Sequence, residues 1–453
     1  MSTEPSRPGF HVTAPTGWIN DPLGVSWHEG ADGGRYELFV QYNPDAPEWV
    51  PACRWGQLTS PDLVRWEWVG TALSPGPEEA GCWSGAVVAG GDGVPVILYT
   101  SVQAERLDLG SIGLATGDPA WRSWTTDPGG PVLAGPPPEF GMTHFRDPFV
   151  WRHGDSWRMA VGGGLPDGRA AVVQYSSSDL RRWSFDGVIA ERSGAETEPI
   201  WTGSVWECVQ LFPLDSAWVL LLSVWHANEG HRVACAVGDY DGRRFTARAW
   251  QRFTATDAVY ATTTFTDAAG RHCAISWVRE PVEAGPEWAG LLSLPVVLSL
   301  DGDRVTVAPH PDVDGLRTGV LAALEPGVLP AEGLVLGPFG PCLDVELEPA
   351  DGGAVRLAVG DLLELRTDRG ALTLARPGRA DERMTLGPGT AGLRLLLDVG
   401  VAEVFASGDA ASVRLESADG DPAGGPVPLT VYGAAVHRLT VHGMPGSGLP
   451  LSR

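Results

Sequence analysis

Short apolar runs, and not helical periodicity, dominate the first 300 residues of the chain. Five of these runs have the length and residue content of β-strands and start 58, 62, 61 and 54 residues apart: Tyr36–Tyr42, Val94–Thr100, Ser156–Gly162, Ala217–Trp225 and Arg271–Val278. A second predicted strand follows each of them: Arg54–Thr59, Ser111–Thr116, Ala170–Ser176, Arg232–Val237 and Leu291–Leu298. A fixed period with several strands per unit is typical of a β-propeller.

A similar turn follows most of the second strands. Ser60-Pro-Asp-Leu-Val-Arg-Trp66 resembles Ser177-Ser-Asp-Leu-Arg-Arg-Trp183, and the aspartates of four such turns are 56, 61 and 60 residues apart: Asp62, Asp118, Asp179 and Asp239. One such pair can arise by chance in an irregular sandwich, whereas four phased copies indicate a repeat. The pattern therefore predicts five propeller blades.

The pattern changes after residue 300. Residues 300–319 contain Pro309, Pro311 and repeated Asp and Gly, which predicts a connector. Beyond it, four segments alternate apolar and polar residues, as expected of an antiparallel β-sandwich: Cys342–Leu347, Leu362–Thr367, Leu393–Leu397 and Ala402–Ala406. We therefore predict an all-β chain, with a five-bladed β-propeller catalytic domain over residues 1–305, a linker over 306–320 and a β-sandwich over 321–453.

Composition narrows the function. The chain has a net charge of -24 and no Lys, so it lacks the basic surface that binds nucleic acid. Its 19 Trp include candidates for stacking on a sugar ring. No apolar run reaches the roughly 18 residues of a membrane span. No signal peptide is visible at the start, so we expect a cytoplasmic protein.

Candidate chemistry lies just upstream of the five predicted first strands, in segments Trp18–Gly24, Gly81–Gly85, Phe145–Phe149, Val205–Val209 and Asp257–Ala261. Because the first strand of each blade lines the central channel, residues in equivalent phase should converge at one mouth of it. This brings together three carboxylates and one Arg: Asp21, Asp147, Glu207 and Arg146.

Three converging carboxylates fit the cleavage of a glycosidic bond. One carboxylate attacks the sugar or activates water, a second protonates the leaving oxygen, and a third can hold hydroxyl groups as charge develops. Glu207 stands between Trp206 and Cys208, and apolar surroundings favour the protonated form that a general acid requires.

At these residues the sequence resembles glycoside hydrolase family 32, the invertases, levanases and inulinases. The family motifs W-M-N-D-P-N-G, Q-Y-N-P, W-G-H, F-S-G, R-D-P and E-C have counterparts here, in order: Trp18–Gly24, Gln41–Pro44, Trp55–Gln57, Trp83–Gly85, Arg146–Pro148 and Glu207-Cys208. Trp288–Pro295 resembles the family's segment at the end of the propeller, and Val401–Phe405 resembles its sandwich signature.

The resemblance implies a retaining double displacement on a β-fructofuranosyl or closely related furanosyl linkage. It implies Asp21 as the nucleophile, Glu207 as the acid/base and Asp147 as the stabiliser of the transition state. The positions that match sugar-lining residues of the family are Asn20, Gln41, Trp49, Trp83, Ser84, Arg146, Tyr260 and Trp288. The implied partner is a small carbohydrate, without a metal, an organic cofactor, nucleic acid or a membrane; the oligomeric state is left open.

Four departures from the family motifs keep the function open. Leu23 and Gln57 replace the usual Asn and His, Trp83 replaces Phe, and Val209 stands where Pro often follows E-C. The main rival is a non-hydrolytic enzyme of the same fold, acting by fructosyl transfer or by acid/base chemistry on a ketose-derived metabolite. A sugar-binding propeller without turnover is a further candidate, and so is the inverting family 43 of the arabinanases.

Overall fold

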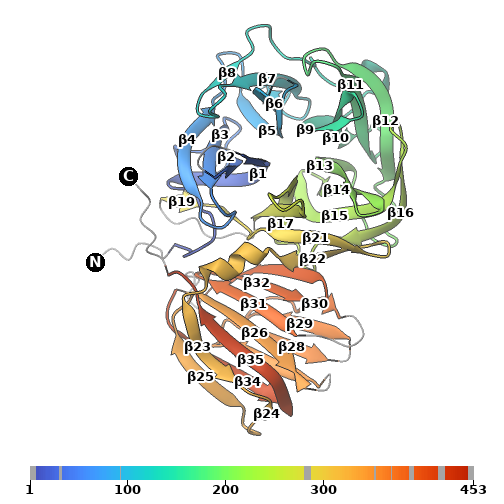
Figure 1. Ribbon diagram of the computed structural model, residues 1–453. Coiled ribbons are helices and arrows are strands. Elements are labelled where there is room, and N and C mark those ends of the chain that lie inside the picture. Colours follow the sequence, from blue (N-terminus) through green and yellow to red (C-terminus); the bar gives the residue numbers. More distant parts are fainter. Residues whose placement is uncertain are drawn as a thin grey trace.

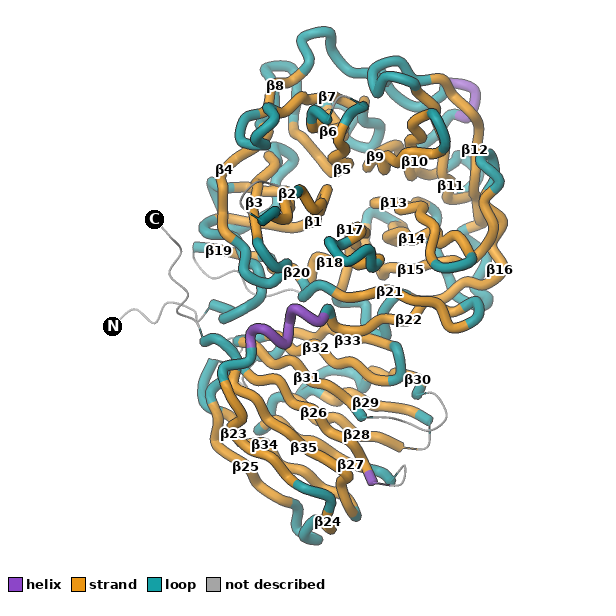
Figure 2. Tube along the Cα trace, viewed as in Figure 1, coloured by secondary structure: helices purple, strands orange, loops and turns teal. Residues whose placement is uncertain are grey.

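The computed structural model describes residues 7–29, 33–91, 93–279, 287–350, 353–368, 370–386, 392–416 and 424–446. The described chain is built almost entirely of strands and loops (Figure 2). Within the described residues, no helix combines the length and the apolar character needed to cross a bilayer. The chain forms a ring of β-sheets followed by a two-sheet sandwich (Figure 1), so the predicted propeller and sandwich fold is confirmed.

Five sheets surround a common centre in the ring (Figure 1). The first sheet contains β1 (Gly17–His28), β2 (Arg35–Asn43), β3 (Arg54–Ser60) and β4 (Glu67–Leu73), and the second contains β5 (Gly81–Ala89), β6 (Pro95–Val102), β7 (Ser111–Gly117) and β8 (Trp124–Thr126). The third sheet contains β9 (His144–His153), β10 (Ser156–Gly164), β11 (Arg169–Ser177) and β12 (Ser184–Ser193). The fourth contains β13 (Val205–Leu214), β14 (Ala217–His226), β15 (Glu229–Tyr240) and β16 (Phe245–Arg252).

The fifth sheet and a two-residue strand close the ring. The sheet contains β17 (Val259–Thr266), β18 (His272–Val278), β20 (Leu291–Leu292), β21 (Val296–Asp301) and β22 (Arg304–Pro309). Strand β19 (Trp288–Ala289) lies between β18 and β20 in sequence but belongs to the first sheet, where it pairs in parallel with β1, with Trp288 opposite Gly17. The segment of chain that builds the fifth sheet thereby also contributes a strand to the first sheet.

The innermost strand of each sheet is the motif segment itself, which corrects the sequence prediction. Strands β1, β5, β9, β13 and β17 contact one another around the ring, and the five predicted first strands are instead the second strands of their sheets, β2, β6, β10, β14 and β18. Three of the motif segments contain Pro or Gly: Trp18–Gly24, Gly81–Gly85 and Phe145–Phe149. These residues hide the alternation by which a strand is recognised.

The sandwich packs two antiparallel sheets. One contains β23 (Gly319–Leu324), β24 (Gly327–Val328), β26 (Leu343–Pro349), β31 (Leu393–Asp398), β32 (Val401–Ala406), β33 (Asp409–Arg414) and β35 (Ala435–Gly443). The other contains β25 (Leu334–Phe339), β27 (Val355–Val359), β28 (Leu363–Asp368), β29 (Ala371–Ala375), β30 (Glu382–Thr385) and β34 (Val427–Gly433). Buried aliphatic residues from both sheets fill the space between them.

The connector is shorter than the sequence predicts. Strand β22 pairs with β21 and buries Val305 and Val307, so the ring extends to Pro309. Only the short 3-10 helix Pro311–Leu316 separates it from β23. The strands place the junction inside the predicted linker 306–320, and the division into domains at residues 305 and 321 stays a proposal.

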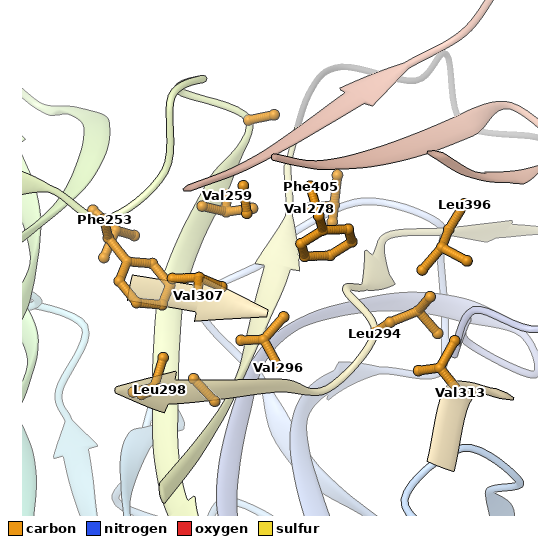
Figure 3. Close-up of a cluster of buried hydrophobic side chains, with 14 of the residues drawn as sticks. Phe253, Val259, Val278, Leu294, Val296, Leu298, Val307, Val313, Leu396 and Phe405 are labelled. Atoms are coloured by element: carbon orange, nitrogen blue, oxygen red, sulfur yellow. The ribbon is translucent and has the colours of Figure 1, made fainter. Parts of the chain in front are cut away.

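An apolar cluster joins the ring to the sandwich. It combines Val259, Val296 and Val307 of the fifth sheet with Leu396 and Phe405 of the sandwich (Figure 3). All of these side chains are buried. The sandwich is therefore attached by shared apolar packing as well as by the chain itself.

Candidate active site

A β-bulge interrupts the pairing of every innermost strand at the same level of the ring. The register shifts lie between Ile19 and Pro22, Trp83 and Gly85, Arg146 and Phe149, Glu207 and Gln210, and Tyr260 and Thr263. Three bulge residues have positive φ: Asp147 (63°), Cys208 (47°) and Ala261 (47°). A bulge re-aims the neighbouring side chains. The bulges therefore turn consecutive polar residues towards the centre.

The centre of the ring holds a small cavity that all five innermost strands line. Its walls include Leu23, Ser84, Asp147, Cys208 and Thr263. These residues are far apart in sequence, and each comes from a different innermost strand. The predicted convergence of the motif segments at one point is confirmed by this lining.

Asp21 is held by a network of neutral donors. The Asn20 side-chain amide donates to its Oδ1 at 2.9 Å, and the Ser84 hydroxyl donates to its Oδ2 at 2.5 Å. Gln41 accepts from Asn20 at 3.1 Å and donates to the Ser84 oxygen at 2.7 Å. Burial raises the pKa of Asp21 to about 6, although the bonds from Ser84 and Asn20 oppose the rise. Asp21 is therefore an oriented carboxylate that is ionised at neutral pH.

Glu207 has a partner at each oxygen. The Arg146 guanidinium donates to Oε1 through Nε at 2.7 Å and lies at 2.6 Å through Nη2, and the Tyr260 hydroxyl donates to Oε2 at 2.5 Å. Burial and the Glu207 charge raise the pKa of Tyr260 well above its usual value, so the phenol keeps its proton. The apolar neighbours predicted from sequence are only part of the environment, because a cation also lies against Glu207.

Aromatic rings surround the Arg146 guanidinium. Its centre lies 5.9 Å from the Trp83 ring and 5.5 Å from the Trp225 ring. Trp49 contacts Trp83 edge to face at 5.7 Å, and 44% of Trp49 is exposed. These rings form an apolar wall beside the ion pair, as a sugar-binding site requires.

Asp147 lies beside both other carboxylates. Its Oδ2 accepts the Cys208 backbone N–H at 3.1 Å, and its own N–H donates to the Thr100 hydroxyl oxygen at 2.7 Å. The Cys208 Sγ lies 3.6 Å from Asp147 Oδ2 and 3.6 Å from Asp21 Oδ2. Burial and the charge of Glu207 raise the pKa of Asp147 to about 7, against the effect of Arg146.

Trp288, a predicted sugar-lining residue, and Gln57, a departure from the family motif, have different surroundings. Trp288 packs in the apolar cluster that contains Ile19 and Leu292, with Arg7 4.9 Å above its ring. Gln57 donates to Glu37 at 2.9 Å and to the Trp121 carbonyl at 2.7 Å. The contacts of Trp288 are those of a residue that packs the first sheet against the fifth, and its role in sugar binding stays a prediction.

Several residues of the site were missed from sequence. The hydroxyl oxygens of Thr100 and Ser223 accept the backbone N–H groups of two bulge residues, Asp147 and Ala261. The Trp225 ring packs on Arg146. Cys208 belongs to the E-C motif. Its position beside Glu207 was the one feature of the sequence that could have indicated that its thiol lies in the site. Thr100, Ser223 and Trp225 lie towards the ends of second strands, where no local pattern marks them.

One cluster outside the centre has the composition of a metal site. Ligand atoms of Asp267, Cys273 and His310 lie within 4.8 Å of one another. However, Asp267 Oδ2 already accepts Arg271 Nε at 2.6 Å and lies 3.0 Å from His310 Nε2. Because a guanidinium occupies the carboxylate, we interpret the cluster as a satisfied hydrogen-bond network.

The fold and the centre define a propeller–sandwich protein with three buried carboxylates. Residues 11–311 match the N-terminal domain of the glycosyl hydrolases family 32. The chain belongs to glycosyl hydrolase family 32, as the motif resemblance indicated.

Sequence relatives agree with this assignment. Sucrose-6-phosphate hydrolase of Escherichia coli is 33% identical over 338 residues, covering 68% of this chain and 66% of that protein. Sucrose-6-phosphate hydrolase of Salmonella typhimurium is 29% identical over 440 residues, covering 88% and 86%. The matches to the Escherichia coli and Zymomonas mobilis sucrose-6-phosphate hydrolases span 66% and 63% of those proteins.

Solved structures show the same fold over nearly the whole chain. The Bombyx mori GH32 β-fructofuranosidase has a TM-score of 0.84 at 26% identity, covering 98% of this chain and 94% of that one. The fructan 1-exohydrolase IIa of Cichorium intybus has a TM-score of 0.80 at 21% identity, covering 98% of each chain. The second likeness supports the fold alone.

Proposed function

We propose that the protein is a retaining β-fructofuranosidase. The observation that carries the proposal is the convergence of Asp21, Asp147 and Glu207 on three bulged innermost strands of one ring. The relatives support it, because they are named as hydrolases acting on sucrose 6-phosphate or fructans, and a variant of the Bombyx mori β-fructofuranosidase was solved with sucrose.

In the first step, Asp21 attacks the anomeric carbon of the fructofuranosyl group. The bond from that carbon to the leaving oxygen breaks, and protonated Glu207 gives its proton to this oxygen. A covalent ester between the sugar and Asp21 results. The bonds from Asn20 and Ser84 fix the direction of the attacking carboxylate.

In the second step, water replaces the leaving group. Ionised Glu207 takes a proton from the water, the water oxygen bonds to the anomeric carbon, and the ester to Asp21 breaks. Two displacements at one carbon retain its configuration. Asp147 binds ring hydroxyl groups, and these bonds strengthen as positive charge develops on the ring.

The structure adds no support to fructosyl transfer or other non-hydrolytic chemistry. Gln57, one of the two residues that motivate it, bonds with Glu37 and the Trp121 carbonyl. Leu23, the second, lines the central cavity and packs with Phe39 and Tyr99. Hydrolysis is therefore the function that we propose.

The test measures fructose released from sucrose, a β-2,1 fructan and a β-2,6 fructan, with Asp21→Asn as the blank. We expect release from at least one substrate, a loss of roughly 10⁴-fold or more in the variant, and a first product of retained configuration by NMR. A folded wild-type protein that releases no fructose, or a product of inverted configuration, would contradict the proposal.

A further inference from the structure

Two buried nitrogen atoms at the Arg146–Glu207 ion pair lack hydrogen-bond partners among the described residues. Arg146 binds Glu207 through Nε and Nη2, whereas its Nη1 has no hydrogen-bond partner among the described residues. His144 Nε2, two residues earlier on β9, is also without a partner there. A buried polar group without a partner costs free energy, so such groups indicate where a ligand binds.

A third polar group faces both nitrogens. Asp108 Oδ1 lies 3.7 Å from Arg146 Nη1 and 3.7 Å from His144 Nε2, and the Asp108 side chain is 64% exposed. These distances are too long for direct hydrogen bonds. They suit a polar atom that bonds to the three groups from between them.

The backbone fixes Asp108 at this place. It belongs to the loop between β6 and β7, and its carbonyl accepts the Phe145 N–H at 2.9 Å. Gly110 N–H donates to the Phe145 carbonyl at 3.0 Å, and Leu109 forms a parallel bridge with Phe145. Phe145 separates His144 from Arg146, so the loop is pinned beside both. The exposed side chain can still rotate to admit a ligand.

We propose that Asp108, His144 and Arg146 form a leaving-group subsite that binds a hydroxyl group of an unphosphorylated sugar. The proposal rests on the proposed function, since the subsite adjoins the residue that would protonate the leaving oxygen. A hydroxyl group accepts from Arg146 Nη1 and donates to Asp108. Because the single hydroxyl proton goes to Asp108, His144 Nε2 carries a proton and donates to the hydroxyl oxygen. Burial and the Arg146 charge lower the pKa of His144, so its ring is neutral at pH 7.

The same groups disfavour a phosphorylated leaving group. A phosphate has acceptor oxygens and negative charge, and the exposed Asp108 carboxylate repels it. Arg146 is already paired with Glu207, and the chain contains no Lys. The subsite therefore favours an unphosphorylated leaving group over a phosphorylated one.

The test compares sucrose, sucrose 6-phosphate and fructose. Dissociation constants are measured by calorimetry in an Asp21→Asn background, which leaves the three subsite residues unchanged, and kcat/KM is measured in the active protein. We expect sucrose to be favoured over sucrose 6-phosphate by at least about tenfold. Asp108→Asn should weaken sucrose binding by roughly tenfold and leave fructose binding unchanged. It should also narrow the preference for sucrose over sucrose 6-phosphate. Asp239→Asn, an exposed aspartate paired with Arg248, is the matched control.

Equal or tighter binding of sucrose 6-phosphate would overturn the proposal, and so would an Asp108→Asn variant with unchanged sucrose binding. An Asp108→Ala variant that weakens sucrose and fructose equally would show general damage and would also overturn it. Failure of the proposed function has a different signature, since sucrose would bind with the expected preference while no fructose is released.

Discussion

The Ser84 hydroxyl limits how far burial raises the pKa of Asp21. Burial alone favours the neutral acid, and the Ser84 and Asn20 donors favour the carboxylate. Gln41 donates to the Ser84 oxygen, which leaves the Ser84 proton to point at Asp21. Asp21 is the proposed nucleophile and must be ionised to attack, so the activity should fall with acid as Asp21 is protonated near pH 6.

Ser84→Ala tests this balance. Removing a donor to the charged form raises the pKa of Asp21, so the acidic limb of the kcat/KM profile should move to higher pH than its wild-type position near 6. The measurement is fructose release from the best substrate between about pH 4 and 8. Ser177→Ala, which removes a similar hydroxyl–aspartate bond in a surface turn, should leave the limb in place. An acidic limb that stays or moves to lower pH would contradict the assignment.

At the scale of elements, the site depends on how closely neighbouring sheets approach. Gly162, near the end of β10, faces the Trp206 carbonyl of β13, and a Cβ at this position would lie 2.2 Å from that oxygen and 3.0 Å from Val209 Cγ1. Trp206 immediately precedes Glu207. A glycine at position 162 therefore lets the third sheet pack against the strand that carries Glu207, the proposed acid/base.

Gly162→Ala should push these strands apart. We expect a loss of roughly 1–3 kcal/mol in the free energy of unfolding and a lower kcat, because Glu207 moves relative to Arg146. Urea unfolding and steady-state kinetics measure the two effects. Gly315→Ala is the control, since a Cβ there meets no atom within 4 Å. If Gly162→Ala matches the wild type in both measurements, the close contact does not position Glu207.

At the scale of the whole molecule, a buried ionic cluster joins the N-terminal segment to the sandwich. Asp398 accepts the backbone N–H groups of Gly9, Phe10 and His11 at 2.6, 2.9 and 3.1 Å, and His11 Nδ1 at 2.9 Å. Burial lowers the pKa of His11, but the bond to Asp398 and the negative charges of Asp398 and Glu403 outweigh it and raise the pKa to about 9.

This cluster predicts a loss of stability at alkaline pH. Because the folded pKa of His11 exceeds the unfolded value of 6.5, its contribution is fully present below pH 6.5 and disappears as the pH rises through about 9. This rise in the pKa of His11 corresponds to about 3 kcal/mol in the free energy of unfolding. Urea unfolding at about pH 6 and about pH 9.5 should show this loss in the wild type and in a His437→Gln control, and a much smaller loss in His11→Gln. A parallel loss in all three proteins would refute the role of His11.

The sequence determined the repeat, the two parts of the fold and the three carboxylates. Blade turns such as Ser60–Trp66 and Ser177–Trp183 are local structures, so their residues mark them directly. Asp21, Asp147 and Glu207 were found from their shared phase in the repeat, because equivalent positions of a cyclic fold meet at its centre.

Only the tertiary structure decided which strands are innermost and what surrounds each carboxylate. The bulges at Asp147, Cys208 and Ala261 arise from pairing between strands, which no local pattern encodes. Arg146 is adjacent to Asp147 in sequence, yet it pairs with Glu207 on the next sheet. Asp108 reaches the site through a bridge between separate sheets. These contacts depend on how the sheets pack, and packing is settled by the whole chain together.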